Sequence, residues 1–191
     1  SDQDEEDTFA LHRFIWLLRW LAQSPPRDAL CGAEQIILDW IKKVSAARKD
    51  AVWSTYSASE RVVNWLLFLC ATKEHRPIDL KSAGVIGGSL HSHLKYIMNH
   101  LEFYGQSFNN HILNNARALY IAGIFLNLPQ VADLGRILFR RCMPTLIDAE
   151  GFLLEGSSHY QLLLTRTIVE VWWAAKISGD LHFCEWSGNV A

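Results

Sequence analysis

The sequence predicts an all-α fold built from helical hairpins. Apolar residues recur three and four positions apart along most of the 191-residue chain, which is the spacing of one helix face. No stretch of strict apolar and polar alternation is bounded by turn residues, so no strand is predicted. The predicted helices are about 15 to 20 residues long and are separated by short loops, a pattern that favours antiparallel hairpins.

The first predicted helices follow a polar terminus. Residues 1–7 carry five acidic groups and are expected to be disordered or frayed, which leaves 8–191 as the helical domain. A helix begins near Thr8 and stops at Ser24-Pro25-Pro26, because proline interrupts helical hydrogen bonding. A second helix is expected over about 33–47.

Helix-terminal signals define the later elements. Ser57-Ala58-Ser59-Glu60 has the spacing of a capping box and predicts the start of the third helix. The last helix is expected to begin after Ser157 or Ser158 and to end at Ser178-Gly179. The remaining helices are predicted over 87–104, 110–127 and 129–148.

Composition limits the possible partners. An apolar fraction of 50% with 20% charged residues indicates a globular domain. A formal net charge of -2 offers no excess of positive charge for a phosphate backbone, so nucleic acid is not an expected partner. The longest apolar runs, 66–71 and 171–175, are far shorter than the roughly 20 residues of a membrane helix, so no membrane partner is expected.

No metal or cofactor is expected. The four cysteines are far apart and form no C-x-x-C pair, so we interpret them as small buried apolar residues. His91 and His93, two positions apart on a predicted helix, cannot share one face. A zinc site formed by these two residues and His100 is therefore not predicted.

Two polar segments stand out on the apolar background, 109–111 and 155–160. Each places a proton-exchanging group, His111 or Tyr160, beside polar residues at a helix terminus, where packing alone would favour aliphatic side chains. Structural alternatives exist for each residue. Asn109 or Asn110 can cap a helix, His111 can lie in the core, and Tyr160 can anchor its own helix.

Three segments, 53–65, 102–120 and 155–160, together resemble the N-terminal helical domain of the heparinase II/III family, which is similar in fold to the alginate lyases. The resemblance covers about 9–177 and implies an incomplete (α/α) toroid of about seven helices. Family members often place histidine directly after the tyrosine. In this sequence that position is Gln161.

The resemblance implies β-elimination of a uronic-acid-containing polysaccharide, an anionic partner, without a cofactor. The C5 proton is weakly acidic until the neighbouring carboxylate is neutralised, so the reaction needs a neutraliser, a base and an acid. The resemblance assigns the first role to Asn110, while His111 completes the carboxylate clamp or acts as base. Tyr160 protonates the leaving O4 and, in a syn elimination, also takes the C5 proton. Arg61 binds substrate and supplies the positive charge that a tyrosine base needs, unless it pairs with Glu60 or another helix.

The family's toroid normally continues and is followed by a β-sandwich that supplies another catalytic histidine. The sequence ends at Ala191 without either, so we expect a truncated domain with little activity alone. A second hypothesis is a non-catalytic carbohydrate-binding or scaffold domain of capsule or exopolysaccharide metabolism, and a third is a helical protein-interaction domain. The oligomeric state stays open, and the compartment would be periplasmic or extracellular for a degradative enzyme and cytoplasmic for a biosynthetic one.

Overall fold

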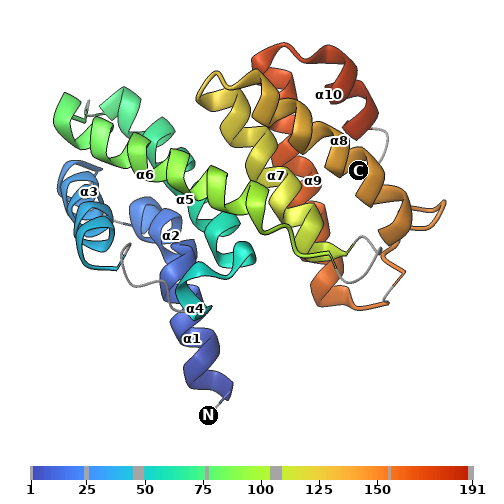
Figure 1. The fold of residues 1–191 in the computed structure, drawn as a ribbon, viewed down its shortest axis with the longest axis horizontal. Coiled ribbons are helices and arrows are strands. Elements are labelled where there is room, and N and C mark those ends of the chain that lie inside the picture. Colours follow the sequence, from blue (N-terminus) through green and yellow to red (C-terminus); the bar gives the residue numbers. More distant parts are fainter. Residues whose placement is uncertain are drawn as a thin grey trace. The chain divides into compact units, whose positions relative to one another are not determined.

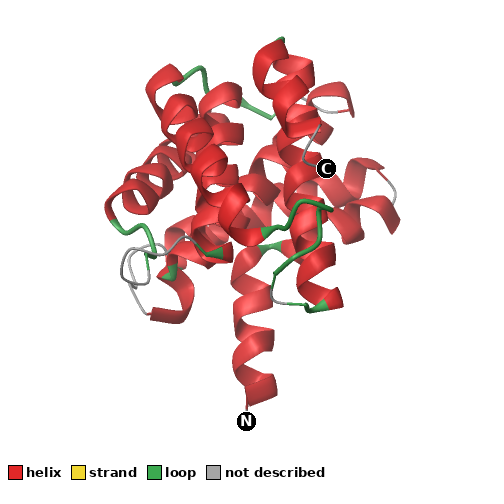
Figure 2. Cartoon of the chain, turned by 90° about the vertical axis from the view of Figure 1, so that its right-hand side faces the viewer, coloured by secondary structure: helices red, strands yellow, loops and turns green. Residues whose placement is uncertain are grey.

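The computed structural model describes residues 2–23, 26–44, 50–75, 78–103, 109–154 and 156–188. Within these ranges every regular element is a helix (Figures 1 and 2), and one isolated antiparallel bridge joins Ile147 to Leu153. The all-α prediction is confirmed, while the toroid stays a prediction. The chain forms two compact units, residues 1–100 and 101–191.

The first unit is organised around one central helix. Its elements are α1 (Asp2–Arg13), α2 (Ile15–Gln23), α3 (Pro26–Lys43), α4 (Asp50–Trp53), α5 (Thr55–His75) and α6 (Leu80–Asn99). α5 contacts all the other helices of the unit. Its side chains Val62, Trp65 and Phe68 are fully buried, so the core of this unit lies around α5.

Phe14 separates α1 from α2, where the sequence pattern had predicted one continuous helix. Its φ of 60° lies in the left-handed region, which is costly for a residue with a side chain. The ring is only 1% exposed and packs edge-on against Trp40 and Trp65. Burial of this ring therefore offsets the backbone strain. α1 already begins at Asp2, so residues 2–7 belong to this helix and the helix starts earlier than Thr8.

The break between α1 and α2 leaves backbone carbonyl groups for α5 to satisfy. Arg61 Nη1 donates to the His12 carbonyl at 2.8 Å, and Asn64 Nδ2 donates to the Arg13 carbonyl, also at 2.8 Å. The last carbonyls of a helix have no partner within the helix. Two polar side chains of α5 thus complete the end of α1.

The Arg61 guanidinium makes its other contacts inside the same unit. Nη2 donates to the Val52 carbonyl at 3.1 Å, and Nε donates to His93 Nε2 at 2.9 Å. The guanidinium carbon lies 4.2 Å from the ring centroid of Trp40, a cation–π geometry. Because Nε2 accepts from a cation, His93 is neutral in this arrangement.

Capping side chains move two helix starts away from the predicted positions. The Ser54 hydroxyl accepts from the Ser57 amide at 3.2 Å, so α5 begins before the predicted capping box. The Asp79 carboxylate accepts from two amides of the first turn of α6, at 2.9 and 3.0 Å. This cap outweighs the low helix propensity of the glycines in α6, which therefore begins at Leu80 and not at residue 87.

The second unit is a helical hairpin with two further helices. It contains α7 (Asn110–Phe125), α8 (Pro129–Leu146), α9 (Ser158–Ser178) and α10 (Leu181–Gly188). α7 and α8 pack along each other as the predicted hairpin, α9 contacts α7, and α10 contacts α9 (Figure 1). The starts of α7 and α8 and both ends of α9 agree with the prediction, whereas α10 was not predicted.

α7 and α8 approach each other closely at two glycines. A Cβ on Gly135 would lie 2.4 Å from the Tyr120 backbone nitrogen, and one on Gly123 would lie 2.3 Å from the Ala132 backbone nitrogen. Backbone atoms cannot move aside without separating the helices, so both positions require a residue without a side chain.

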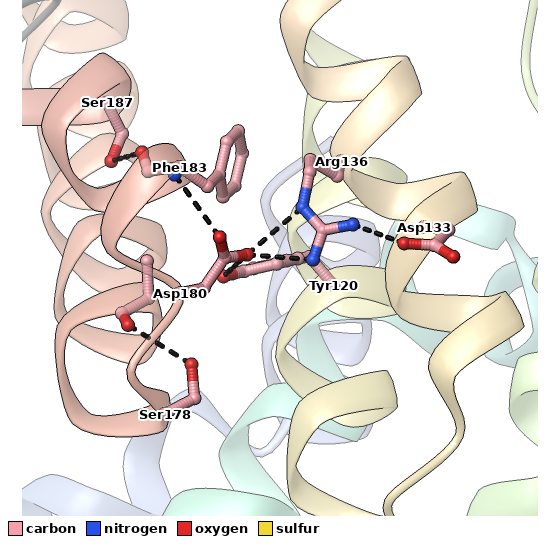
Figure 3. Close-up of polar contacts among 8 residues, drawn as sticks. Tyr120, Asp133, Arg136, Ser178, Asp180, Phe183 and Ser187 are labelled. Carbon is pink, nitrogen blue, oxygen red and sulfur yellow. Dashed lines mark hydrogen bonds and ion pairs between the residues drawn. The ribbon is translucent and has the colours of Figure 1, made fainter.

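Asp180 connects the turn between α9 and α10 to the α7–α8 hairpin through hydrogen bonds (Figure 3). One carboxylate oxygen accepts from the Phe183 amide at 3.2 Å. The other accepts from the Tyr120 hydroxyl at 3.0 Å and from Arg136 Nε and Nη2 at 3.0 and 2.7 Å. Burial acts to raise the pKa of Asp180, but the hydrogen bonds from Arg136 and Tyr120 lower it overall. The ionised carboxylate therefore links α7, α8 and α10.

We expect Gly135→Ala to lower the free energy of unfolding by about 1–3 kcal/mol, because the added methyl group forces α7 and α8 apart. The control is Gly84→Ala on the exposed face of α6, where a Cβ meets nothing within 4 Å. That substitution should raise the free energy of unfolding by about 1 kcal/mol through helix propensity. Urea unfolding followed by circular dichroism measures both, and a Gly135→Ala protein as stable as the wild type would contradict the close approach.

We also expect the free energy of unfolding to fall as the pH drops below about 6.5, the ordinary pKa of histidine. Burial and, next, the positive charge of Arg61 lower the pKa of His93 to about 3 in the folded protein. The unfolded chain therefore binds more protons between these two values. Stability is full above about pH 7 and is lost on acidification, by up to about 1.4 kcal/mol per pH unit for one proton.

His93→Gln keeps an acceptor for Arg61 and removes this titration. Its unfolding free energy should change less between about pH 7 and pH 5 than that of the wild type. Part of the slope will persist, because burial and Arg61 also lower the pKa of His12. Urea unfolding at a series of pH values gives both curves, and parallel curves would rule out His93 as the source.

Candidate functional site

α7 and α9 run in the same direction within the second unit. Arg117 Nε of α7 lies 2.7 Å from Glu170 Oε2 of α9. Farther along both helices, the Tyr120 hydroxyl donates to Asp180, which follows α9. The two contacts occur in the same order along both helices, so α7 and α9 are parallel and begin at the same end of the unit (Figure 1).

This shared end holds the predicted site residues of both helices. At 1.5 Å per residue, Asn110 lies roughly 10 Å along α7 from Arg117, and Tyr160 lies roughly 15 Å along α9 from Glu170. Counted from the ion pair between Arg117 and Glu170, Asn110 and Tyr160 differ by about 5 Å along the helix axes. Counted from the hydrogen bond between Tyr120 and Asp180, they differ by roughly 15 Å. We call residues 101–103, 109–111, 147–154 and 156–161 the α7–α9 end.

Asn109 is the N-cap of α7 and also holds the preceding segment. Its Oδ1 accepts from the amides of His111 and Ile112 at 2.8 and 3.0 Å. Its Nδ2 donates to the Glu102 carbonyl at 3.0 Å, and its own carbonyl accepts from Cys142 Sγ at 3.3 Å. Asn109 therefore has the structural role that the sequence had left open.

Asn110 is the first residue of α7 and is half-buried. Because Asn109 supplies the cap, the capping alternative does not apply to Asn110. Its amide stands at the helix N-terminus, where backbone N–H groups and the helix dipole favour a negative charge.

His111 is half-buried and not a core residue. Its Nδ1 lies 2.7 Å from Glu102 Oε2, and the two side chains are 34% and 24% exposed. Glu102 belongs to the segment that resembles the lyase family, but the sequence assigned no role to it. A separation of nine residues across a loop gives no periodic signal, so pattern reasoning missed this pair.

Tyr160 lies in the first turn of α9 and is 43% exposed. The Ser157 hydroxyl accepts from the Tyr160 amide at 3.4 Å, which confirms Ser157 as the N-cap. The His159 ring lies edge-on to the Tyr160 ring, with 5.7 Å between centroids. The exposed ring argues against a role in anchoring the helix.

Gln161 occupies the position where the family often has histidine, and it holds a loop. Its Oε1 accepts from the Leu153 amide at 2.6 Å, and its Nε2 donates to the Gly151 carbonyl at 3.3 Å. Both ends of the amide are thus used to fix the loop that leads to Tyr160. Glu155, in the same motif, lies outside the described residues.

Arg61 does not fit the substrate-binding role predicted for it. It belongs to the first unit, is 0% exposed, and its guanidinium donates to two backbone carbonyls and to His93. Removing a guanidinium from these acceptors inside a core would leave buried polar groups without partners. Sequence spacing could not identify these acceptors, because they come from α1, α4 and α6, and the His12 carbonyl lies at a helix break that has no sequence signature.

The cysteines differ from the prediction in their exposure. Cys142 is buried, and burial raises the pKa of its thiol to about 12, so it stays protonated as a donor. Cys31 and Cys70 are exposed, contrary to the expectation that all four are buried. In the part of the chain that the structure describes, no three His, Cys, Asp or Glu side chains cluster as metal ligands would. None of the helices described is both long and apolar enough to cross a bilayer.

We expect Asn109→Ala to lower the free energy of unfolding by about 1–3 kcal/mol, because it removes both the cap and the bond to the Glu102 carbonyl. Asn109→Ser is the matched variant, since serine caps equally well but is too short to bond both partners. It should lose about 1 kcal/mol, the share of one neutral hydrogen bond. Urea unfolding gives the two values, and an Asn109→Ser protein as stable as the wild type would mean that the bond to Glu102 contributes nothing.

No protein family, curated protein or solved structure matches this chain. A functional assignment therefore rests on the arrangement of residues at the α7–α9 end and on the sequence resemblance.

Proposed function

We propose that this chain is the helical domain of a polysaccharide lyase that cleaves uronic-acid-containing polysaccharide by β-elimination. Its hairpins would then belong to an incomplete (α/α) toroid. The observation that carries the proposal is that α7 and α9 begin at the same end of the second unit. Asn110, His111 and Tyr160 belong to the first turns of these helices and therefore lie at that end. Each of these residues is at least partly accessible there.

The substrate class is supported by the electrostatics of this end. Both helices direct the N–H groups of their first turns toward it, and the two helix N-termini carry partial positive charge. A uronate carboxylate can accept from the Asn110 amide beside the first turn of α7. An amide neutralises the carboxylate by hydrogen bonding without a charge of its own.

The reaction has a definite balance of protons and electrons. A base removes the C5 proton, and the C5–H electron pair forms the C4=C5 double bond. The C4–O4 bond breaks with its electron pair on O4, which takes a proton from the Tyr160 hydroxyl. His111 and Tyr160 are the two candidate bases at the α7–α9 end.

The burial of Arg61 favours a second candidate, a non-catalytic domain that binds the same polysaccharide. The predicted mechanism relied on Arg61 to stabilise a tyrosine anion, and its contacts inside the first unit remove that support. A domain that keeps Asn110 and loses the elimination step would still bind uronate.

Binding of uronate oligosaccharides to this chain tests the proposal. Amide resonances of Asn110, His111 and Tyr160 should shift on titration with a tetrameric uronate and stay unchanged with a neutral glucan. Asn110→Ala should weaken binding by about 1.5–3 kcal/mol, or roughly 10- to 100-fold, since it removes a hydrogen bond to a charged group. His182→Ala, at an exposed position on α10, is the control and should bind as the wild type does.

Elimination is followed as ultraviolet absorbance of the new double bond. Tyr160→Phe should reduce any elimination about 100- to 10,000-fold, the usual contribution of a general acid. Uronate binding at the α7–α9 end without new absorbance would favour the non-catalytic candidate. Absence of uronate binding, or shifts confined to other surfaces, would contradict both.

A further inference from the structure

We propose that Glu102 is a positioning residue that fixes the tautomer of His111, with the proton on Nδ1 and the lone pair on Nε2. The proposal starts from the distance of 2.7 Å between His111 Nδ1 and Glu102 Oε2. An ionised carboxylate can only accept a hydrogen bond, so the nitrogen that faces it must be the donor. In the neutral imidazole the other nitrogen then carries the lone pair.

The position of Glu102 is set independently of its own side chain. The Asn109 side chain donates to the Glu102 carbonyl at 3.0 Å and accepts from the His111 amide at 2.8 Å. One side chain therefore holds the backbone of both partners. The Asn109 carbonyl in turn accepts a hydrogen bond from Cys142 Sγ of α8 at 3.3 Å. The backbone around Glu102 and His111 is therefore connected to the α7–α8 hairpin.

Burial makes this contact more than a surface ion pair. Exposed ion pairs are weakened by water and by the entropy of two mobile side chains. The Glu102 and His111 side chains are only 24% and 34% exposed, and their backbones are held by Asn109. A carboxylate that accepts from one imidazole nitrogen is a common device for orienting the other nitrogen toward its reaction partner.

The tautomer decides between the two roles left open for His111. An Nε2 lone pair accepts a proton and cannot donate to a substrate carboxylate, so the carboxylate clamp falls to Asn110 and the base is His111. In the reaction, Nε2 takes the C5 proton and Tyr160 gives its hydroxyl proton to O4. The imidazolium then releases one proton to water and the tyrosine anion regains one. The proposed tautomer rests on the contact with Glu102, whereas the role as base rests on the proposed function.

Nitrogen-15 NMR of the histidine-labelled chain measures the tautomer without substrate, at a pH where the imidazole spectrum no longer titrates. A nitrogen that carries hydrogen and one that carries a lone pair differ widely in chemical shift and in their couplings to the ring protons. We expect the Nδ1–H form for His111. Glu102→Ala should shift His111 to the Nε2–H form that predominates in free histidine, while Glu102→Gln, which keeps an acceptor oxygen, should retain the Nδ1–H form.

Glu150→Ala is the matched control, because Glu150 is an exposed carboxylate at the same end and should leave the His111 spectrum unchanged. An Nε2–H tautomer in the wild type would overturn the proposal, and this reading does not require any variant to fold. An unchanged tautomer in a folded Glu102→Ala protein would overturn it as well.

The outcome separates this inference from the proposed function. An Nδ1–H tautomer that depends on Glu102, in a chain that binds no uronate, would support the pair and reject the lyase assignment. An Nε2–H tautomer in a chain that does bind and cleave uronate would reject the pair and leave the lyase assignment standing.

Discussion

Backbone groups at the ends of helices have no partners within the helix, and in both units of this protein side chains provide the missing hydrogen-bond partners. In the first unit, Arg61 completes the end of α1 by donating to the His12 carbonyl. In the second unit, Asn109 caps α7 and at the same time holds Glu102. The packing around α5 and the arrangement at the α7–α9 end both depend on these contacts, because Arg61 joins α5 to α1 and Asn109 joins α7 to the segment before it.

Arg61 is used inside the core of the first unit, so the proposed mechanism cannot draw on it for the positive charge that a tyrosine base needs. A tyrosine with an ordinary pKa of about 10 is an acid at neutral pH, and it becomes a base only beside a positive charge. Since the Arg61 guanidinium is enclosed by its own unit, the proposed mechanism gives Tyr160 the role of protonating the leaving oxygen. The proposed proton acceptor is His111, which has the carboxylate of Glu102 at its Nδ1.

Local signals in the sequence were sufficient to predict several helix ends. The end of α9 follows from Gly179, whose φ of 76° favours glycine, and the start of α7 follows from an asparagine cap. The break at Phe14 could not be predicted, because its strain is offset by rings on α3 and α5 that are far away in sequence. The pair between Glu102 and His111 is only nine residues apart, but it spans a loop and therefore gives no periodic signal. Sequence spacing describes one helix face, whereas these contacts depend on which segments meet in the fold.

The glutamine after Tyr160 connects the loop geometry to the proposed chemistry. The Gln161 side-chain amide accepts from the Leu153 amide and donates to the Gly151 carbonyl. Both of its polar atoms therefore hold the loop. A histidine at this position could supply a base next to the tyrosine, whereas the glutamine amide has no group that exchanges protons at neutral pH. In the proposed mechanism, the glutamine at position 161 cannot act as a base, so His111 has to remove the C5 proton.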